Sequence, residues 1–208
     1  MFVKICGITR REDVDAAVAC GADALGFIFW PRSPRCIDAH RAGAIVASLP
    51  PFVTPVGVFV DQPAEDVNRI ASTAKLGAVQ LHGNESPEYA LLIERPVVKA
   101  IAVGANVPAD DSIWPANVLI LLDVHDPVRR GGTGQTVDWT AAAEIAGRRR
   151  TILAGGLTAD NVADAIACVR PYGIDVSSGV EASPGIKDHG RLKALFEAVH
   201  GSHYAARS

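Results

Sequence analysis

Short apolar runs alternate with longer amphipathic stretches along the chain. The runs read as strands, whereas the stretches between them repeat apolar residues at helical spacing. Most runs lack a polar residue at every second position, which indicates strands covered on both faces, as in a parallel sheet. The pattern predicts eight strands: Phe2–Cys6, Ala24–Phe29, Thr54–Val60, Ala78–Leu81, Val97–Ile101, Val118–Asp123, Thr151–Ala154 and Gly173–Val176.

A helix is predicted after each strand, and strands separated by helices indicate βαβ units. Eight such units favour an α/β fold of the closed (β/α)8 type, the TIM barrel, over a doubly wound sheet. A flavodoxin-like or Rossmann sheet would leave strands over, and no Gly-x-Gly-x-x-Gly follows the first strand. The predicted helices are Arg10–Cys20, Asp38–Ser48, Pro63–Leu76, Ser86–Ile93, one within Asn106–Ile113, one beginning near Asp138, Thr158–Val169 and Asp188–His200.

The chain has 208 residues, close to the lower limit of about 200 for such a barrel. We therefore expect a single catalytic domain over residues 1–200 and a C-terminal tail over 201–208. Net charge is −3, from 20 basic and 23 acidic residues, so the overall positive charge of a nucleic-acid binder is missing. The one basic run, Arg148–Arg150, is expected to be a solvated turn.

The four cysteines form no Cys-x-x-Cys pair, so neither a zinc nor a redox motif is predicted. Reduced thiols fit a cytoplasmic protein best. The segment Met1–Lys4 runs straight into a predicted strand, so we expect no signal peptide. No apolar run approaches the roughly 20 residues that span a membrane. Partners are thus expected to be small molecules, and the pattern leaves a monomer or a homodimer open.

In barrels of this type the active site lies at the C-terminal ends of the strands. Two glycine-rich turns follow the last two strands, Gly155-Gly156 and Ser178-Gly179. Loops at these places frequently bind phosphate through backbone N–H groups. The alternative is that the glycines only make tight turns, but two adjacent loops in this order favour a phosphorylated substrate.

Cys6 and Asp123 end two predicted strands and are candidates for acid/base chemistry. Strand alternation places Lys4 on the same face as Cys6, and a nearby ammonium would lower the pKa of the thiol. Asp123 closes an apolar run, where desolvation would keep it protonated as a general acid. The alternatives are an inert packing thiol and a loop-capping carboxylate. A Lys4–Asp175 pair across neighbouring strands would compete with Cys6 for the ammonium.

Arg35 lies between prolines and suits a carboxylate or a phosphate, with an exposed salt bridge as the alternative. His82 follows the fourth strand, and the first interpretation is a core histidine that orients its neighbours. Cys20 and Cys36 look like packing residues, and Cys168 falls on the expected buried face of its helix.

The chain resembles the phosphoribosylanthranilate isomerase family of tryptophan biosynthesis. The segment Val3–Thr9 is quite specific to that family, whereas other phosphate-binding barrels share Ala154–Leu157 and Val176–Glu181. The resemblance implies an Amadori rearrangement without cofactor or metal, with Cys6 as general base, Asp123 as general acid and Arg35 at the anthranilate carboxylate. It implies phosphate binding at Gly155, Gly156, Ser178 and Gly179, and it includes His82 in the substrate site. The matching segments are Val3–Thr9, Pro31–Arg35, Val79–Gly83, Gly131–Gly134, Ala154–Leu157 and Val176–Glu181.

Fold alone does not fix function, so two other classes stay open. One is another phosphosugar barrel, such as an epimerase, a decarboxylase or the related histidine-pathway isomerase, which uses paired aspartates. The other is a non-catalytic phosphoribosyl-ligand binder, which would need neither Cys6 nor Asp123. The glycine-containing loop His125–Val137 is expected either to close over the site or to have no function.

Overall fold

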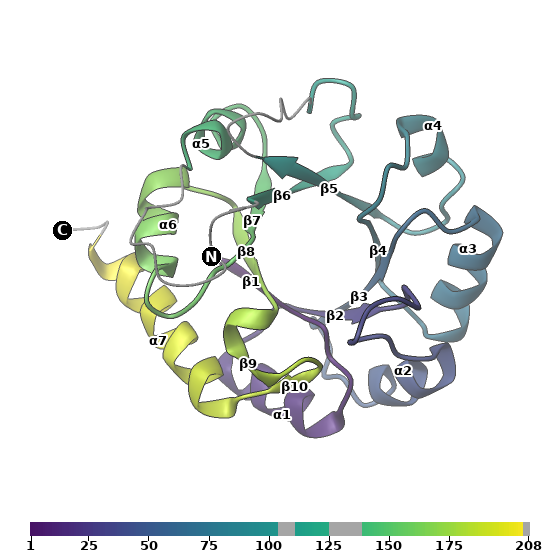
Figure 1. Cartoon of the computed structure of the whole chain (residues 1–208), viewed down its shortest axis with the longest axis horizontal. Coiled ribbons are helices and arrows are strands. Elements are labelled where there is room, and N and C mark those ends of the chain that lie inside the picture. The colour runs from purple at the N-terminus through teal and green to yellow at the C-terminus, as the bar shows by residue number, and fades with distance from the viewer. Residues whose placement is uncertain (104–110, 125–138, 206–208) are drawn as a thin grey trace.

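The computed structural model describes residues 1–103, 111–124 and 139–205. The eight predicted strands form a closed barrel in chain order, from β1 round to β8 and back to β1 (Figure 1). Every neighbouring pair is parallel, so the predicted TIM barrel is confirmed. The strands are β1 (Phe2–Cys6), β2 (Ala24–Ile28), β3 (Thr54–Phe59), β4 (Ala78–Leu81), β5 (Val97–Val103), β6 (Leu119–Val124), β7 (Thr151–Ala154) and β8 (Gly173–Val176).

Helices form a ring around the barrel (Figure 1). Local signals set their ends: the Asp38 side chain accepts a hydrogen bond from the backbone N–H of Arg41 and caps α2. Gly21 ends α1 in the left-handed region at φ 102°. The helices are α1 (Arg11–Cys20), α2 (Ala39–Val46), α3 (Ala64–Thr73), α4 (Pro87–Ala90), α5 (Thr140–Ala146), α6 (Val162–Val169) and α7 (His189–Ala205).

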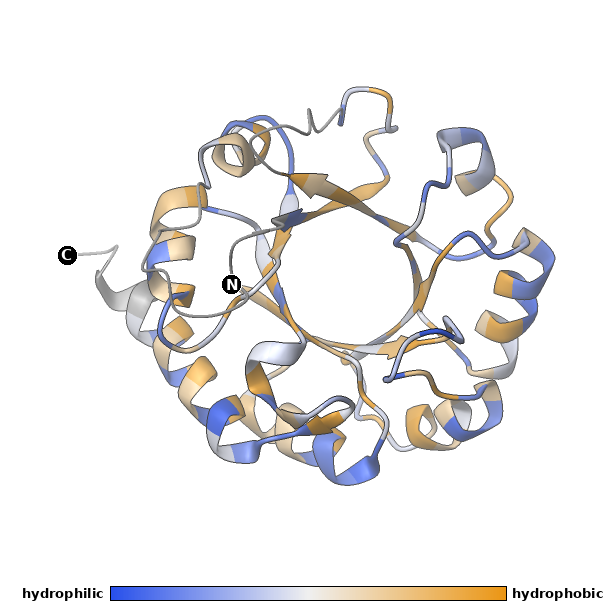
Figure 2. Ribbon diagram, viewed as in Figure 1, coloured by the Kyte–Doolittle hydropathy of each residue, from blue (hydrophilic) through white to orange (hydrophobic). Residues whose placement is uncertain are grey.

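Strand alternation separates two layers of side chains. Residues such as Val3 and Ile5 point outward into the main hydrophobic core between strands and helices. The inward positions hold a small apolar cluster that includes Leu121 and Ile152. The strands are mostly apolar in Figure 2, which fits coverage on both faces. Among the described helices, none is both long and apolar enough to cross a membrane.

An additional unit after β8 was not predicted. It consists of a 3-10 helix, η1 (Ser178–Val180), and the two-stranded sheet of β9 (Glu181–Ser183) and β10 (Ile186–Lys187). Strands this short carry no readable period, so the pattern could not predict them. The only available signal was Pro184-Gly185, a dipeptide that marks a turn.

Several expected boundaries differ from the structure. The helix α7 continues past His200 to Ala205, so the expected tail is partly helical, although it begins with a glycine, which costs about 1 kcal/mol within a helix. The strand β5 continues to Val103. Of the helix expected within Asn106–Ile113, only residues 111–113 are described, and they are not helical. The loop His125–Val137 and its segment Gly131–Gly134 lie outside the described residues.

Candidate active site

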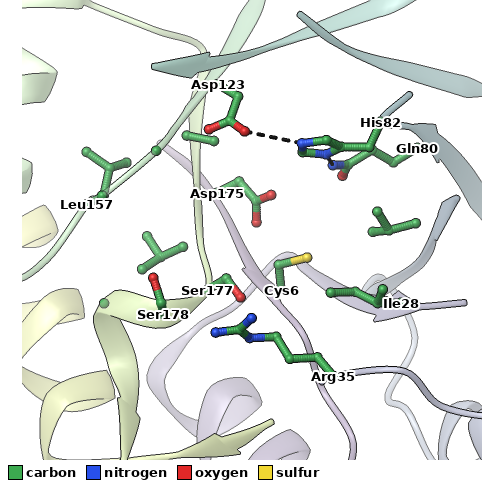
Figure 3. A pocket seen from close by; sticks show the side chains of 16 residues that line it. Cys6, Ile28, Arg35, Gln80, His82, Asp123, Leu157, Asp175, Ser177 and Ser178 are labelled. Atoms are coloured by element: carbon green, nitrogen blue, oxygen red, sulfur yellow. Dashed lines mark hydrogen bonds and ion pairs between the residues drawn. The ribbon is translucent and has the colours of Figure 1, made fainter. Parts of the chain in front are cut away.

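A cavity of about 430 Å³ opens at the C-terminal ends of the strands. Its lining comes from every barrel strand except β5 and from the loops after β2, β4, β7 and β8 (Figure 3). Every residue that the sequence assigned to the site lines this one cavity. These residues are Cys6, Arg35, His82, Asp123, Gly155, Gly156, Ser178 and Gly179.

The predicted pair of Lys4 and Asp175 is confirmed. The two residues are partners in the register of β1 with β8, and Lys4 Nζ lies 2.7 Å from Asp175 Oδ2. Burial lowers the pKa of Lys4, but Asp175 and Cys6 together outweigh it and raise the pKa above its usual value. The ammonium therefore remains charged and is shared between Asp175 and Cys6.

The expected low pKa of Cys6 is wrong. The residue is only 6% exposed, and burial raises the pKa of the thiol. The Lys4 ammonium acts in the expected direction and lowers it, but the Asp175 carboxylate raises it again. The net pKa lies above the usual value, so the resting group is the thiol.

Gly26 in β2 makes room for this pair of side chains. It is the register partner of Cys6. A Cβ atom at Gly26 would lie 2.7 Å from the Cys6 sulfur and 3.1 Å from Lys4 Nζ. Any side chain there would push the thiol or the ammonium out of place.

Asp123, His82 and Gln80 form a chain of hydrogen bonds on the opposite side of the cavity (Figure 3). Gln80 Nε2 lies 2.9 Å from His82 Nδ1, and His82 Nε2 lies 3.2 Å from Asp123 Oδ2. Because the amide nitrogen of Gln80 donates, His82 Nδ1 accepts and the ring proton is on Nε2, where it points at Asp123. His82 is thus a cavity residue rather than a core histidine.

The apolar enclosure expected for Asp123 is only partial, since its side chain is 35% exposed. Gln80, by contrast, is 1% exposed, although it also lines the cavity. It stood in the family-like segment Val79–Gly83 but was given no role. A polar residue within an otherwise apolar strand was the signal that pointed to it.

The two glycine-rich loops meet each other as expected for an anion site. Gly155 and Gly156 have φ values of 93° and 61°, which favour glycine. A Cβ atom at Gly179 would collide with the backbone carbonyl of Leu157, so the loops touch through their backbones. Ser178 and Gly179 begin η1, where backbone N–H groups have no acceptor within the helix. Such N–H groups suit a phosphate.

Arg35 lines the cavity and forms a double contact with Glu181. Arg35 Nε lies 2.8 Å from Glu181 Oε1, and Arg35 Nη2 lies 2.6 Å from Oε2. The alternative of an exposed salt bridge is wrong, because the two side chains are 21% and 4% exposed. Neither Glu181 nor Lys187 was predicted to have a role, and the Lys187 side chain is fully buried beside Glu181.

Of the other cysteines, only Cys20 packs against the hydrophobic core as expected. Cys36 and Cys168 are exposed and Cys20 is partly buried. Their environment gives them no part in the cavity. In the described ranges, no group of three His, Cys, Asp or Glu side chains could hold a metal ion.

Fold and site together define a class: a (β/α)8-barrel enzyme with a thiol, a carboxylate and an anion-binding pair of loops around one cavity. The family model for N-(5′-phosphoribosyl)anthranilate (PRA) isomerase matches residues 3–198. The chain therefore belongs to the PRA isomerase family, and the predicted resemblance is confirmed.

Curated relatives and solved structures agree with this assignment. The N-(5′-phosphoribosyl)anthranilate isomerase of Chromohalobacter salexigens is 51% identical over 95% of this chain and 93% of its own length. The crystal structure of the Thermotoga maritima enzyme is 44% identical, with a TM-score of 0.89 over 97% of this chain and 99% of that one. A PRA isomerase solved with reduced 1-(o-carboxyphenylamino)-1-deoxyribulose 5-phosphate is 41% identical, with a TM-score of 0.86 over the same shares.

Proposed function

We propose that this protein converts N-(5-phosphoribosyl)anthranilate into 1-(2-carboxyphenylamino)-1-deoxyribulose 5-phosphate by an acid/base Amadori rearrangement in tryptophan biosynthesis. The observation that supports this most is that Cys6, Asp123 and Arg35 line the same cavity as the two glycine-rich loops after β7 and β8. The substrate carries a phosphate, a ribose and an aromatic carboxylate, and the cavity offers groups for each. The loops take the phosphate and Arg35 takes the carboxylate, which sets the ribose between Cys6 and Asp123.

The first step opens the ribose ring. Asp123 donates its proton to the ring oxygen, the bond from C1′ to that oxygen breaks, and the nitrogen lone pair forms a C1′=N bond. The product is a protonated Schiff base. His82 Nε2–H donates to Asp123 Oδ2, which stabilises the carboxylate that the transfer leaves behind.

The second step removes the C2′ proton. Cys6 first releases its thiol proton to solvent and then, as a thiolate, takes the C2′ proton; the electron pair of the C2′–H bond forms C1′=C2′, and the electron pair of the C=N bond returns to nitrogen. The enolamine then becomes the ketone as a proton moves from the 2′ oxygen to C1′. The raised pKa of Cys6 makes the thiolate a stronger base but a less populated one.

Two other classes remain alternatives. An epimerase or another phosphosugar isomerase would use the phosphate loops but has no need of Arg35 at an aromatic carboxylate. A non-catalytic phosphoribosyl-ligand binder would need neither the thiol nor the carboxylate. We further propose that the protein acts in the cytoplasm, where its free thiols stay reduced, as a monomer or a homodimer that needs no cofactor.

The test is turnover of freshly generated phosphoribosylanthranilate, followed as the loss of its anthranilate-type fluorescence. Cys6→Ala should lower kcat about 10²–10⁴-fold, since it removes one positioned base. Cys168→Ala removes an exposed thiol in α6 and is the matched control with unchanged rates. Equal turnover by wild type and Cys6→Ala would mean that Cys6 only packs and is not the base. No turnover by wild type would refute the isomerase function.

A further inference from the structure

Three charged side chains form a cluster beside the cavity: Arg35, Glu181 and Lys187. Arg35 comes from the loop after β2, and the other two come from the unit after β8. Glu181 and Lys187 are register partners in the antiparallel pair of β9 and β10, so their side chains leave the pair on the same face. The side-chain exposures of Glu181 and Lys187 are 4% and 0%. The small sheet thus places two buried charges behind a cavity residue.

Glu181 occupies one edge of the Arg35 guanidinium. Arg35 Nε lies 2.8 Å from Oε1 and 3.1 Å from Oε2, and Nη2 lies 2.6 Å from Oε2. An arginine carries five N–H donors in a rigid plane, so Nη1 and one hydrogen of Nη2 remain. In the described part of the chain no protein acceptor for Nη1 is found. In Figure 3 the guanidinium points toward Ser177 and Ser178 at the cavity wall.

The loop after β1 holds Arg35 from a second side. Gly7 has φ 77°, and a Cβ atom there would lie 2.7 Å from Arg35 Cδ. The stem of the arginine therefore packs against the backbone that follows Cys6. With Glu181 on one edge and Gly7 against the stem, the guanidinium has a single orientation before any ligand binds.

Glu181 alone would neutralise the positive charge of Arg35, and Lys187 adds a second positive charge to the cluster. Its Nζ lies 3.0 Å from Glu181 Oε1, 2.6 Å from the Cys6 carbonyl and 3.1 Å from the Ser177 carbonyl. Burial lowers the pKa of Lys187, but three acceptors around one nitrogen require three N–H donors, which only the ammonium has. Two cations and one anion leave a net charge of +1 beside the cavity.

We infer that Glu181 and Lys187 are positioning residues that make Arg35 selective for a ligand whose aryl group carries a carboxylate. The inference rests on the proposed function, in which Arg35 meets that carboxylate. Glu181 fixes the direction of the remaining N–H groups, and Lys187 keeps the cluster positive. An aryl carboxylate at that place gains a charge-assisted hydrogen bond, whereas an unsubstituted aryl group gains nothing from the same arrangement.

The alternative is that Glu181 only competes with the ligand for Arg35. Removing its charge would then strengthen binding of the carboxylate, because Arg35 would be released. The two interpretations predict opposite signs for the same substitution. They are separated by comparing two ligands that differ only in the carboxylate.

The experiment measures Kd by calorimetry for reduced 1-(2-carboxyphenylamino)-1-deoxyribulose 5-phosphate and for the same compound with an unsubstituted phenyl group. In the wild type the carboxylated ligand should bind at least about tenfold more tightly. Glu181→Gln should weaken the carboxylated ligand about tenfold and change the other by less than about threefold. Equal weakening of both ligands, no change, or tighter binding of the carboxylated ligand would each overturn the inference.

Arg35→Met and the double variant Arg35→Met/Glu181→Gln test whether Glu181 acts through Arg35. Both should bind the two ligands with a ratio near one, so that Glu181→Gln has no further effect on selectivity; a further effect would place its action elsewhere. Arg35→Met keeps the Lys187–Glu181 pair. It therefore still tests whether Arg35 recognises the aryl carboxylate if Glu181→Gln alone fails to fold. Glu197→Gln, at a residue with a 67% exposed side chain, is the control and should leave both Kd values unchanged. Turnover by the wild type is measured in parallel, because its absence refutes the proposed function, whereas lost selectivity with intact turnover concerns only the inference.

Discussion

Lys99→Met should destabilise the protein by about 3–5 kcal/mol, because it leaves a buried carboxylate without its cation. Lys99 Nζ lies 2.8 Å from Glu85 Oε2 and 2.6 Å from the Gly83 carbonyl, and the two charged side chains are 6% and 2% exposed. Glu85 also accepts hydrogen bonds from the backbone N–H groups of Gly83 and Asp61. The cluster therefore fixes the loop that directly follows His82.

The size of the effect comes mainly from the uncompensated charge. Lys99 Nζ also lies 5.7 Å from the centre of the Trp114 ring, a contact that contributes about 0.5–1 kcal/mol. Methionine fills similar space, so little of the loss should come from packing. For a chain of this length each kcal/mol shifts Tm by about 2–4 °C, which predicts a decrease of about 6–20 °C.

The assay is urea unfolding followed by tryptophan fluorescence. Burial opposes ionisation of Glu85, but Lys99 and the backbone N–H groups outweigh it and hold the pKa of the carboxyl below its usual value. A lowered pKa stabilises the fold above the pKa of the unfolded chain, about 4.3, and this contribution is lost as the pH falls further. The difference between wild type and Lys99→Met should therefore narrow on acidification.

Two controls separate charge from packing. Lys193→Met removes a cation whose partner is 3.8 Å away with both side chains mostly exposed, and should cost at most about 0.5 kcal/mol. Lys99→Met/Glu85→Gln removes the charge but keeps an oxygen for the backbone N–H groups, and should recover about 2 kcal/mol. A loss below about 1 kcal/mol, a difference that does not change with pH, or no recovery would refute the buried-charge explanation.

Three further predictions concern the cavity. Asp175→Asn removes a carboxylate that raises the pKa of Cys6, so the pKa should fall and alkylation of the thiol at pH 7 should accelerate; an unchanged pH profile of alkylation would contradict this. Gln80→Leu removes the amide that fixes the His82 tautomer. It should lower kcat about three- to tenfold with little change in KM, and a second His82 tautomer should appear in the ¹⁵N spectrum. A single unchanged tautomer would show that Gln80 does not have this role. Gly179→Ala forces two loops apart, and should cost about 1–3 kcal/mol of stability and raise both KM and the Kd for inorganic phosphate; an unchanged phosphate affinity would place the anion elsewhere.

The barrel could be predicted because its signal is local. Four strands have the predicted bounds, β1, β4, β7 and β8, since each is an apolar run between polar turns. The sheet of β9 and β10 could not be predicted, because two or three residues contain no period. Its residues are extended for a tertiary reason: Lys187 Nζ bonds to the Cys6 carbonyl, 181 residues away along the chain.

The residues that line the site could be predicted from the sequence, but the direction of the Cys6 pKa and the ion-pair partner of Arg35 could not. The C-terminal ends of the strands meet at one face of the barrel. Polar residues at those ends, such as Cys6 and Asp123, are therefore predicted to lie together. The direction of the Cys6 pKa was wrong, because alternation identified Lys4 but could not weigh burial and Asp175 against it. In the same way the Arg35 loop gave no sign of Glu181, 146 residues further along the chain.

The charges at the barrel mouth come in pairs from different elements, and this changes how a substitution should be interpreted. Asp175→Asn does not simply delete a contact, because it also frees the Lys4 ammonium to act on Cys6 alone. Loss of stability and gain of thiol reactivity should therefore appear together, from one change and for different reasons. Removing the carboxylate leaves a buried cation with one partner fewer, which destabilises the fold, while the same cation now favours the thiolate. Loosening of the fold would also lower the pKa of Cys6, because burial is the largest cause that raises it, so the shared ammonium is tested by Lys4→Met/Asp175→Asn. Faster alkylation of the thiol in Asp175→Asn that is absent from this double variant is the signature of the ammonium, whereas faster alkylation in both variants would indicate a loosened fold.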